Sequence, residues 1–151
     1  MNQFNTTNEI KSKFNITFND KFNDIILLLF NKNIIPNTDD SNLLYIIGIY
    51  YYHIMDYDLM KKYYFMAIDM KNNDAMYKFG NYYEFIEKNY DNMKKYYLMA
   101  IDNGNTNAMI NLGDYYEITG NKGAAKYYLM AFKKGDNNAY IKYINYLKKQ
   151  V

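Results

Sequence analysis

Hydrophobic residues recur along the chain with the spacing of an amphipathic helix. Met60, Tyr63, Tyr64 and Ala67 lie at positions i, i+3, i+4 and i+7, which places their side chains on one face of a helix. The same stripe returns twice further along the chain, each time with lysine on the opposite face. The pattern predicts three helices, which we name the B helices, over residues 58–71, 90–103 and 122–134.

A second apolar pattern alternates with the first. Met76, Phe79, Gly80 and Tyr83 form a stripe of the same helical spacing, and related stripes precede the first B helix and follow the second and third. The pattern predicts four further helices, which we name the A helices, over residues 42–54, 73–86, 106–118 and 137–149.

Both patterns belong to an internal repeat. Residues 61–69 recur 33 residues later as 94–102, and residues 75–84 recur 33 residues later as 108–117. Periods in the low thirties are typical of stacked helical hairpins, none of which can bury its apolar stripe alone. The sequence therefore predicts an all-α fold: a short right-handed α-solenoid of about three helix–turn–helix repeats with terminal capping helices.

Small residues and tyrosines at equivalent positions of the repeats predict close helix packing. A glycine inside a helix costs about 1 kcal/mol relative to alanine, so we expect Gly80 and Gly113 to lie where a neighbouring helix leaves no room for a Cβ. The positions assigned to the repeat structure are Gly48, Ala67, Ala75, Gly80, Tyr83, Ala100, Ala108, Gly113, Tyr116, Ala131 and Ala139.

The ends of the helices also carry signals. Gly104 and Gly135 follow B helices and are predicted to end them in the left-handed conformation that glycine adopts without strain. Asp91 and Asn121 stand near the starts of B helices, where a side-chain oxygen can accept hydrogen bonds from free backbone N–H groups.

The chain is predicted to have three parts. Residues 1–20 are Asn-rich and are expected to be flexible; residues 21–41 hold a capping helix over 21–33 and a linker; residues 42–151 form the repeat domain. The last A helix is expected to cap the array. Its predicted buried residues are Tyr140, Ile144 and Leu147, and its predicted solvent-facing residues are Lys142, Asn145, Lys148 and Lys149.

Composition and charge exclude several classes of protein. The net charge is only +2 and cysteine is absent, so neither a strong attraction to polyanions nor a disulfide framework is expected. The longest apolar run, residues 25–30, is too short to cross a membrane, and no signal peptide is expected, because the first residues lack a basic stretch followed by an apolar core. We expect a soluble intracellular protein that is not secreted.

The abundance of Asn, Lys, Tyr and Ile indicates an AT-rich genome, and we interpret the many asparagines mainly as its product.

The repeat resembles the Sel1-like repeats, relatives of the tetratricopeptide repeats. Leu112-Gly113-Asp114-Tyr115-Tyr116 is similar to the first-helix signature of that family, and Gly120, Ala124, Tyr127-Tyr128, Ala131, Gly135 and Ala139 are similar to its linker and second helix. The loop between the helices is shorter than in most Sel1-like repeats, and the period approaches the tetratricopeptide value. The motif Lys-Lys-Tyr-Tyr-Leu-Met-Ala and the bias toward residues with AT-rich codons resemble those of repeat proteins from giant DNA viruses of amoebae. Such an origin would place the chain in the host cytoplasm.

The resemblance implies an adaptor or scaffold that binds a partner protein or peptide, viral or host, on a concave surface lined by A helices. Aromatic anchors beside carboxylates and amides suit a peptide with apolar and basic groups. The residues that the family geometry assigns to this surface are Tyr45, Ile49, Tyr52, Tyr77, Asn81, Glu84, Ile110, Asp114 and Glu117.

Catalysis is not expected from this sequence. Asp56 and Asp58 follow the single histidine, His53, but they lie at a turn between two predicted helices and are not expected to orient it. No nucleophile–base pair, phosphate-binding loop or metal-spaced cluster is present. We therefore predict no enzyme activity, no cofactor, no metal and no membrane partner. The alternative function is association with nucleic acid through the lysines of the B helices, without sequence specificity because arginine is absent. Those lysines are Lys61, Lys62, Lys94 and Lys95.

Overall fold

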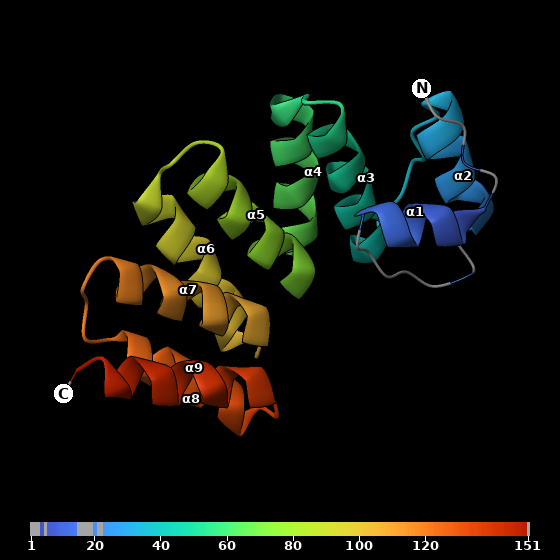
Figure 1. The fold of residues 1–151 in the computed structure, drawn as a ribbon. Helices are drawn as coiled ribbons and strands as arrows, with labels where there is room; N and C mark the ends of the chain where they lie inside the picture. Colours follow the sequence, from blue (N-terminus) through green and yellow to red (C-terminus); the bar gives the residue numbers. More distant parts are fainter. Residues whose placement is uncertain (1–3, 5, 15–19, 21–22, 151) are drawn as a thin grey trace. The chain divides into compact units, whose positions relative to one another are not determined.

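The structure is a computed structural model that describes residues 4, 6–14, 20 and 23–150. These residues form nine α-helices and no strand (Figure 1), which confirms the predicted all-α class. The helices are α1 (Thr7–Phe14), α2 (Asn23–Lys32), α3 (Ser41–His53), α4 (Tyr57–Asp69), α5 (Asn73–Phe85), α6 (Tyr90–Asp102), α7 (Thr106–Ile118), α8 (Ala124–Lys133) and α9 (Asn137–Lys148). The A helices of the repeat are α3, α5, α7 and α9; the B helices are α4, α6 and α8.

The N-terminal segment contains a helix that the sequence analysis did not predict. Within the region expected to be flexible, α1 spans eight residues and buries Ile10 completely. Aromatic contacts hold its end, because the ring of Phe14 stacks on Phe30 of α2 at 4.9 Å between centroids. The rest of that prediction falls partly on residues 1–3, 5 and 15–19, and the start of the predicted 21–33 helix falls on residues 21–22; these lie outside the described residues.

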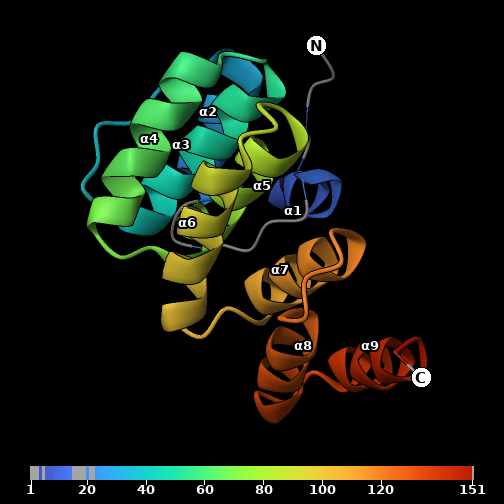
Figure 2. The ribbon, with the colours of Figure 1, turned by 90° about the vertical axis from the view of Figure 1, so that its left-hand side faces the viewer.

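The chain forms two compact units, Met1–Ala75 and Met76–Val151. The division lies in the first turn of α5, inside the predicted repeat domain. In the first unit α2 contacts both α1 and α3, and α3 packs along α4. In the second unit α6 contacts α7, and α8 contacts both α7 and α9; these helices follow one another in Figure 2.

Each helix pair is closed by the same feature, a tyrosine of the B helix against a glycine of the A helix. A Cβ on Gly48 would lie 2.4 Å from the ring of Tyr64, one on Gly80 would lie 2.4 Å from the ring of Tyr97, and one on Gly113 would lie 2.7 Å from the ring of Tyr128. The predicted need for glycine at positions 80 and 113 is confirmed. The group that excludes a Cβ is a tyrosine ring of the paired helix.

The remaining positions assigned to the repeat structure pack as predicted. The six repeat alanines are completely buried, and Tyr83 is buried against Tyr96 with the two rings stacked at 5.5 Å between centroids. Tyr116 is half-buried. Its ring lies 5.5 Å from that of Tyr127.

The helix ends follow the predicted chemistry with two corrections. Gly104 and Gly135 have φ angles of +83° and +99° just after α6 and α8, as expected of glycines that end helices. Asp91 is not the cap of α6: it lies inside the first turn, and the side chain of Asn89 accepts the capping bond from the Asn92 N–H. Asn121 does not cap α8 either: its side chain accepts a bond from the N–H of Gly123, the residue before the helix, and α8 has no side-chain cap.

Asparagine also supplies other helix caps, which the interpretation of Asn as a product of genome composition had overlooked. The side chain of Asn72 accepts a hydrogen bond from the Ala75 N–H at the start of α5, and that of Asn105 accepts one from the Ala108 N–H at the start of α7. A cap of this kind is worth about 0.5–2 kcal/mol relative to alanine. Several asparagines therefore have a structural role.

The last helix presents a different face from the predicted one. Tyr140 and Leu147 are exposed and Ile144 is half-buried, whereas Ala139 and Tyr146 are the buried residues of α9. Lys142, expected to face water, forms an ion pair with Asp114 of α7. The physical reason is that Tyr146 packs on the ring of Tyr128 in α8 while Lys142 pairs with Asp114 in α7. The face of α9 that turns inward is therefore the one that carries these two residues.

Candidate functional site

The second unit contains two polar clusters, one above each tyrosine that closes a helix pair. The ring of Tyr97 is completely buried and passes beside Gly80, so its hydroxyl emerges on the side of α5 that carries the next polar residues. The hydroxyl oxygen lies 2.6 Å from Asn81 Oδ1 and 2.5 Å from Glu84 Oε2. Gly80 therefore determines the position of the Tyr97 hydroxyl group, because only a residue without a Cβ lets the ring pass at this point.

An amide of the following A helix completes this first cluster. Asn111 Nδ2 of α7 donates hydrogen bonds to Asn81 Oδ1 and to the Tyr97 hydroxyl, each at 3.1 Å. The second-repeat cluster thus consists of Asn81, Glu84, Tyr97 and Asn111, and it links three helices. The three side chains around the Tyr97 hydroxyl are half-buried, so they remain partly accessible while being fixed in position.

Burial sets the protonation behaviour of this cluster. It raises the pKa of the Glu84 carboxyl, and the nearby negative charge of Asp114 raises it further against the opposing hydrogen bond from Tyr97. The pKa of the Tyr97 hydroxyl is also raised, first by burial and then by its bond to the Glu84 carboxylate. Tyr97 therefore stays protonated and donates, and Glu84 is a carboxylate whose charge is incompletely compensated.

The same geometry returns one repeat later. The ring of Tyr128 is completely buried beside Gly113. Its hydroxyl lies 2.7 Å from Asp114 Oδ1 and 2.8 Å from Glu117 Oε2. Here two carboxylates occupy the positions that Asn81 and Glu84 hold in α5, one and four residues after the glycine.

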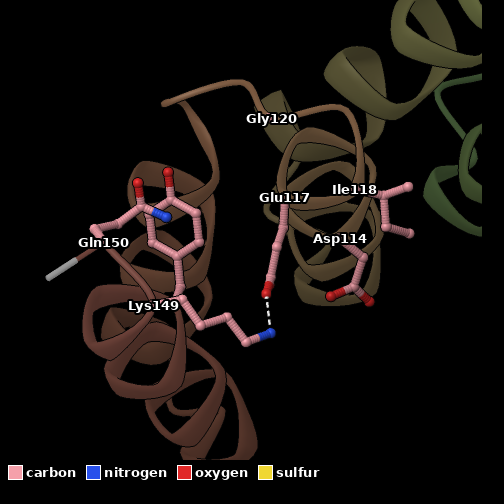
Figure 3. Close-up of a pocket in the computed structure, with 7 residues that line it drawn as sticks. Asp114, Glu117, Ile118, Gly120, Lys149 and Gln150 are labelled. Atoms are coloured by element: carbon pink, nitrogen blue, oxygen red, sulfur yellow. Dashed lines mark hydrogen bonds and ion pairs between the residues drawn. The ribbon is translucent and has the colours of Figure 1, made fainter.

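Two lysines, one in α9 and one at its C-cap, complete this third-repeat cluster, which consists of Asp114, Glu117, Tyr128, Lys142 and Lys149. Lys142 Nζ lies 2.7 Å from Asp114 Oδ1, and Lys149 Nζ lies 2.6 Å from Glu117 Oε1. The hydrogen bonds from Lys149 and Tyr128 lower the pKa of the Glu117 carboxyl. Figure 3 shows Lys149 reaching across to Glu117 at the edge of a cavity of about 520 Å³.

The structure brings together only part of the predicted surface. Asn81, Glu84, Asp114 and Glu117 join the two clusters, and two half-buried predicted residues, Tyr77 and Ile110, lie on the same helices. The ring of Tyr77 stacks on that of Tyr97 at 6.1 Å between centroids.

Two predicted surface residues are corrected. Tyr45 and Ile49 are buried, with 5% and 4% of their surfaces exposed, so neither is available to a partner. The ring of Tyr45 packs against Tyr64 instead. Tyr52 is half-buried beside His53 and Tyr57. All three predicted residues of the first repeat belong to the first unit.

Sequence reasoning missed five members of the clusters. Tyr97 and Tyr128 were interpreted as core residues, which they are, but their hydroxyls also reach the polar face. Lys142 and Lys149 were assigned to solvent, and Asn111 was not singled out. The available signal was a carboxylate four residues after the glycine in two of the three A helices that contain one, at Gly80–Glu84 and Gly113–Glu117.

Comparisons with known proteins add no further identification. Neither a protein-family model nor a curated protein sequence matches the chain. The class that the described residues define is an all-α array of helix pairs, each closed by a tyrosine and a glycine. None of the described helices is long and apolar enough to cross a membrane. The described residues also include no group of three or more histidine, aspartate or glutamate side chains suited to a metal ion.

The opposite pKa shifts of the two glutamates make a stability prediction. Because the pKa of Glu84 is raised on folding, its ionised form opposes folding at neutral pH, and stability is gained as pH falls through the raised pKa. Glu84→Gln should therefore leave the melting temperature at pH 7 equal to or above that of the wild type. The difference should shrink as pH falls and the wild-type carboxyl takes up its proton.

Glu117→Gln is the matched control, because it should behave in the opposite way. The pKa of Glu117 is lowered on folding, so its contribution is present above the ordinary glutamate pKa and is lost as pH falls through the lowered one. Glu117→Gln should cost up to about 1 kcal/mol at pH 7. Thermal unfolding followed by circular dichroism between pH 3 and about pH 7 measures both; shifts of the same sign for the two variants would contradict the assigned environments.

Proposed function

We propose that this chain is a non-enzymatic protein-interaction module that binds a basic segment of a partner protein on the exposed face of α5 and α7. The observation that carries the proposal is Glu84, a half-buried carboxylate held by the hydroxyl of Tyr97. A carboxylate that is fixed in advance and short of positive charge favours a lysine or arginine, since little ordering remains to be done on binding.

The surroundings of Glu84 support the same chemistry. Asp114 lies close enough to raise the pKa of Glu84 by charge repulsion, and a bound cation would relieve that repulsion. Tyr77 and Ile110, on the same two helices and half-buried, offer apolar surface for neighbouring side chains. The expected ligand is therefore a segment that combines lysine or arginine with apolar residues.

The lysines of the B helices support the alternative function less well. Lys62 lies over the ring of Tyr63, Lys95 over the ring of Tyr96 and Lys94 over the ring of Tyr115, with Nζ 5.2–5.6 Å from the ring centroids. Cation–π contacts of this kind give these ammonium groups partners within the chain itself. Nucleic-acid association stays an alternative without a structural observation in its favour, and the Sel1-like assignment and viral origin stay predictions from the sequence.

A peptide selection tests the proposal. Random peptides displayed on phage and selected on the purified chain should be enriched in lysine and arginine beside apolar residues. The selected peptide is then measured by fluorescence anisotropy against Glu84→Gln/Asp114→Asn. The affinity should fall at least about tenfold, because a hydrogen bond to a charged group contributes about 1.5–3 kcal/mol.

The control removes two negative charges elsewhere in the same unit. Asp91 and Asp102 are exposed on α6, so Asp91→Asn/Asp102→Asn changes the net charge equally without touching either cluster. This variant should bind within about twofold of the wild type, since exposed charges act mainly through screened, long-range effects. Equal losses in the two variants, or peptides without basic residues, would remove the site from this face.

A further inference from the structure

The third-repeat cluster already holds basic groups, and they come from the chain itself. Lys142 of α9 and Lys149 at its C-cap place their Nζ atoms 2.7 Å and 2.6 Å from Asp114 and Glu117 of α7. The ammonium group of Lys142 also lies 5.8 Å from the centre of the Tyr128 ring. Two carboxylates on the face proposed to bind a basic partner are thus each paired with a lysine of this chain (Figure 3 shows the Glu117 pair).

The neighbouring repeat is not occupied in this way. The positions of Lys142 and Lys149 correspond to those of Asn111 and Ile118, 31 residues earlier in α7. An amide therefore stands where Lys142 would be, and an apolar residue stands where Lys149 would be. In the part of the chain that the structure describes, no lysine forms an ion pair with Glu84.

The lysine contacts can be broken without dismantling the core. The packing of α9 depends on Ala139, which is completely buried, and on Tyr146, which is buried in a cluster with Ala124 and Tyr128 of α8. Lys149 is the cap residue at the end of α9, and 67% of its side chain is exposed. The cavity of about 520 Å³ beside it is lined by both carboxylates and by Ile118, so an incoming side chain has room to approach Glu117.

We propose that Lys142 and Lys149 form an autoinhibitory contact in which α9 occupies the third-repeat carboxylates and a basic partner must displace it. The inference rests on the proposed function, because it concerns the regulation of that same face. Under this arrangement Glu84 is accessible first, and Asp114 and Glu117 become available only when the lysines leave. The apparent affinity is reduced by the fraction of molecules in which the lysines are in place.

The experiment measures a fluorescein-labelled octalysine peptide binding to the full chain by anisotropy. Lys142→Met/Lys149→Met should bind octalysine about tenfold more tightly than the wild type, as expected when the internal competitor occupies the site about nine-tenths of the time. The control, Lys133→Met/Lys148→Met, removes the same charge from exposed positions on α8 and α9. It should change the affinity by no more than about twofold. A gain of equal size in both variants, or no gain in the first, overturns the proposal.

Folding of the double variant is checked by its melting curve. If it is unstable, Lys149→Met alone decides, because that side chain is largely exposed at the helix end; it should still bind octalysine several-fold more tightly than Lys148→Met. Hydrogen exchange gives an independent reading in the wild type. Octalysine should speed amide exchange at the C-terminal end of α9 while slowing it in α5, and protection of α9 by octalysine overturns the proposal.

The two proposals fail in different ways. If Glu84→Gln lowers octalysine affinity and the Lys142→Met/Lys149→Met variant shows no gain, only the autoinhibitory contact is wrong. If octalysine binds equally well to the wild type and to Glu84→Gln/Asp114→Asn, or does not bind at all, both the proposed function and this inference are wrong.

Discussion

Gly80→Leu is expected to lower the free energy of unfolding by about 1–3 kcal/mol or more, the usual range for overpacking in a well-packed core. A Cβ at this position would lie 2.4 Å and 2.5 Å from two carbons of the Tyr97 ring, a separation that packed atoms do not reach. Helix propensity acts in the other direction, since leucine is favoured over glycine by nearly 1 kcal/mol. A net loss therefore shows that the contact outweighs the propensity, and urea unfolding measures it.

A double-mutant cycle identifies the tyrosine as the cause. Gly80→Ala adds only the Cβ, and it should destabilise the wild type while costing less, or even stabilising, in a Tyr97→Leu background where the ring is gone. The coupling between the two positions should be about 0.5–3 kcal/mol, as for residues in direct contact. If Gly80→Ala stabilises both backgrounds equally, glycine at this position has no packing role.

Tyr97→Ala is expected to cost about 3–5 kcal/mol, the range for removing a large buried aromatic side chain. The ring is completely buried and contacts α5 along Gly80 and Tyr77. Its hydroxyl also joins Asn81, Glu84 and Asn111, so its loss removes both a piece of the core and the donor that holds the second-repeat cluster. Chemical denaturation should show a clearly lowered midpoint.

Tyr97→Phe separates the two roles of this residue. The ring remains, so most of the packing is kept, while the acceptors at Asn81 and Glu84 lose their shared donor at a cost of about 1–3 kcal/mol. Peptide affinity at Glu84 should fall even though the helix content is unchanged, because the carboxylate is no longer held in place. A Tyr97→Phe variant that binds as tightly as the wild type would show that the hydroxyl does not position the site.

The helices themselves could be predicted from the sequence because their information is local. The 3.6-residue spacing of residues such as Met76, Phe79 and Tyr83 marks a buried face wherever the neighbouring helix lies. The repeat provides independent copies of the same pattern, and the predicted bounds of the helices from α3 to α9 differ from the observed ones by at most two residues. The packing role of Gly80 and Gly113 could also be predicted, since a glycine inside a helix lowers its stability unless close packing compensates.

The helix α1 could not be predicted in this way. It has no copy elsewhere in the repeat, and only Thr7 and Ile10 of its eight residues are buried. Its position depends on aromatic contacts such as Phe14 with Phe30, which join residues far apart in the sequence. Periodicity over so short a segment does not distinguish a helix from an irregular chain.

The polar clusters were decided by the tertiary structure. Hydrogen bonds form only when donor and acceptor approach within about 3 Å, and the sequence does not say that the Tyr97 hydroxyl emerges beside Asn81 and Glu84. Equivalent residues of the two repeats also have different partners. The following A helix supplies the amide of Asn111 to one cluster and the ammonium group of Lys142 to the other. The sequence by itself determined the helices and, except in parts of α3 and α9, which of their faces are buried. The packing of α7 and α9 in the second unit determined which carboxylates are paired with lysines, because charge pairing depends on distances that periodicity does not encode.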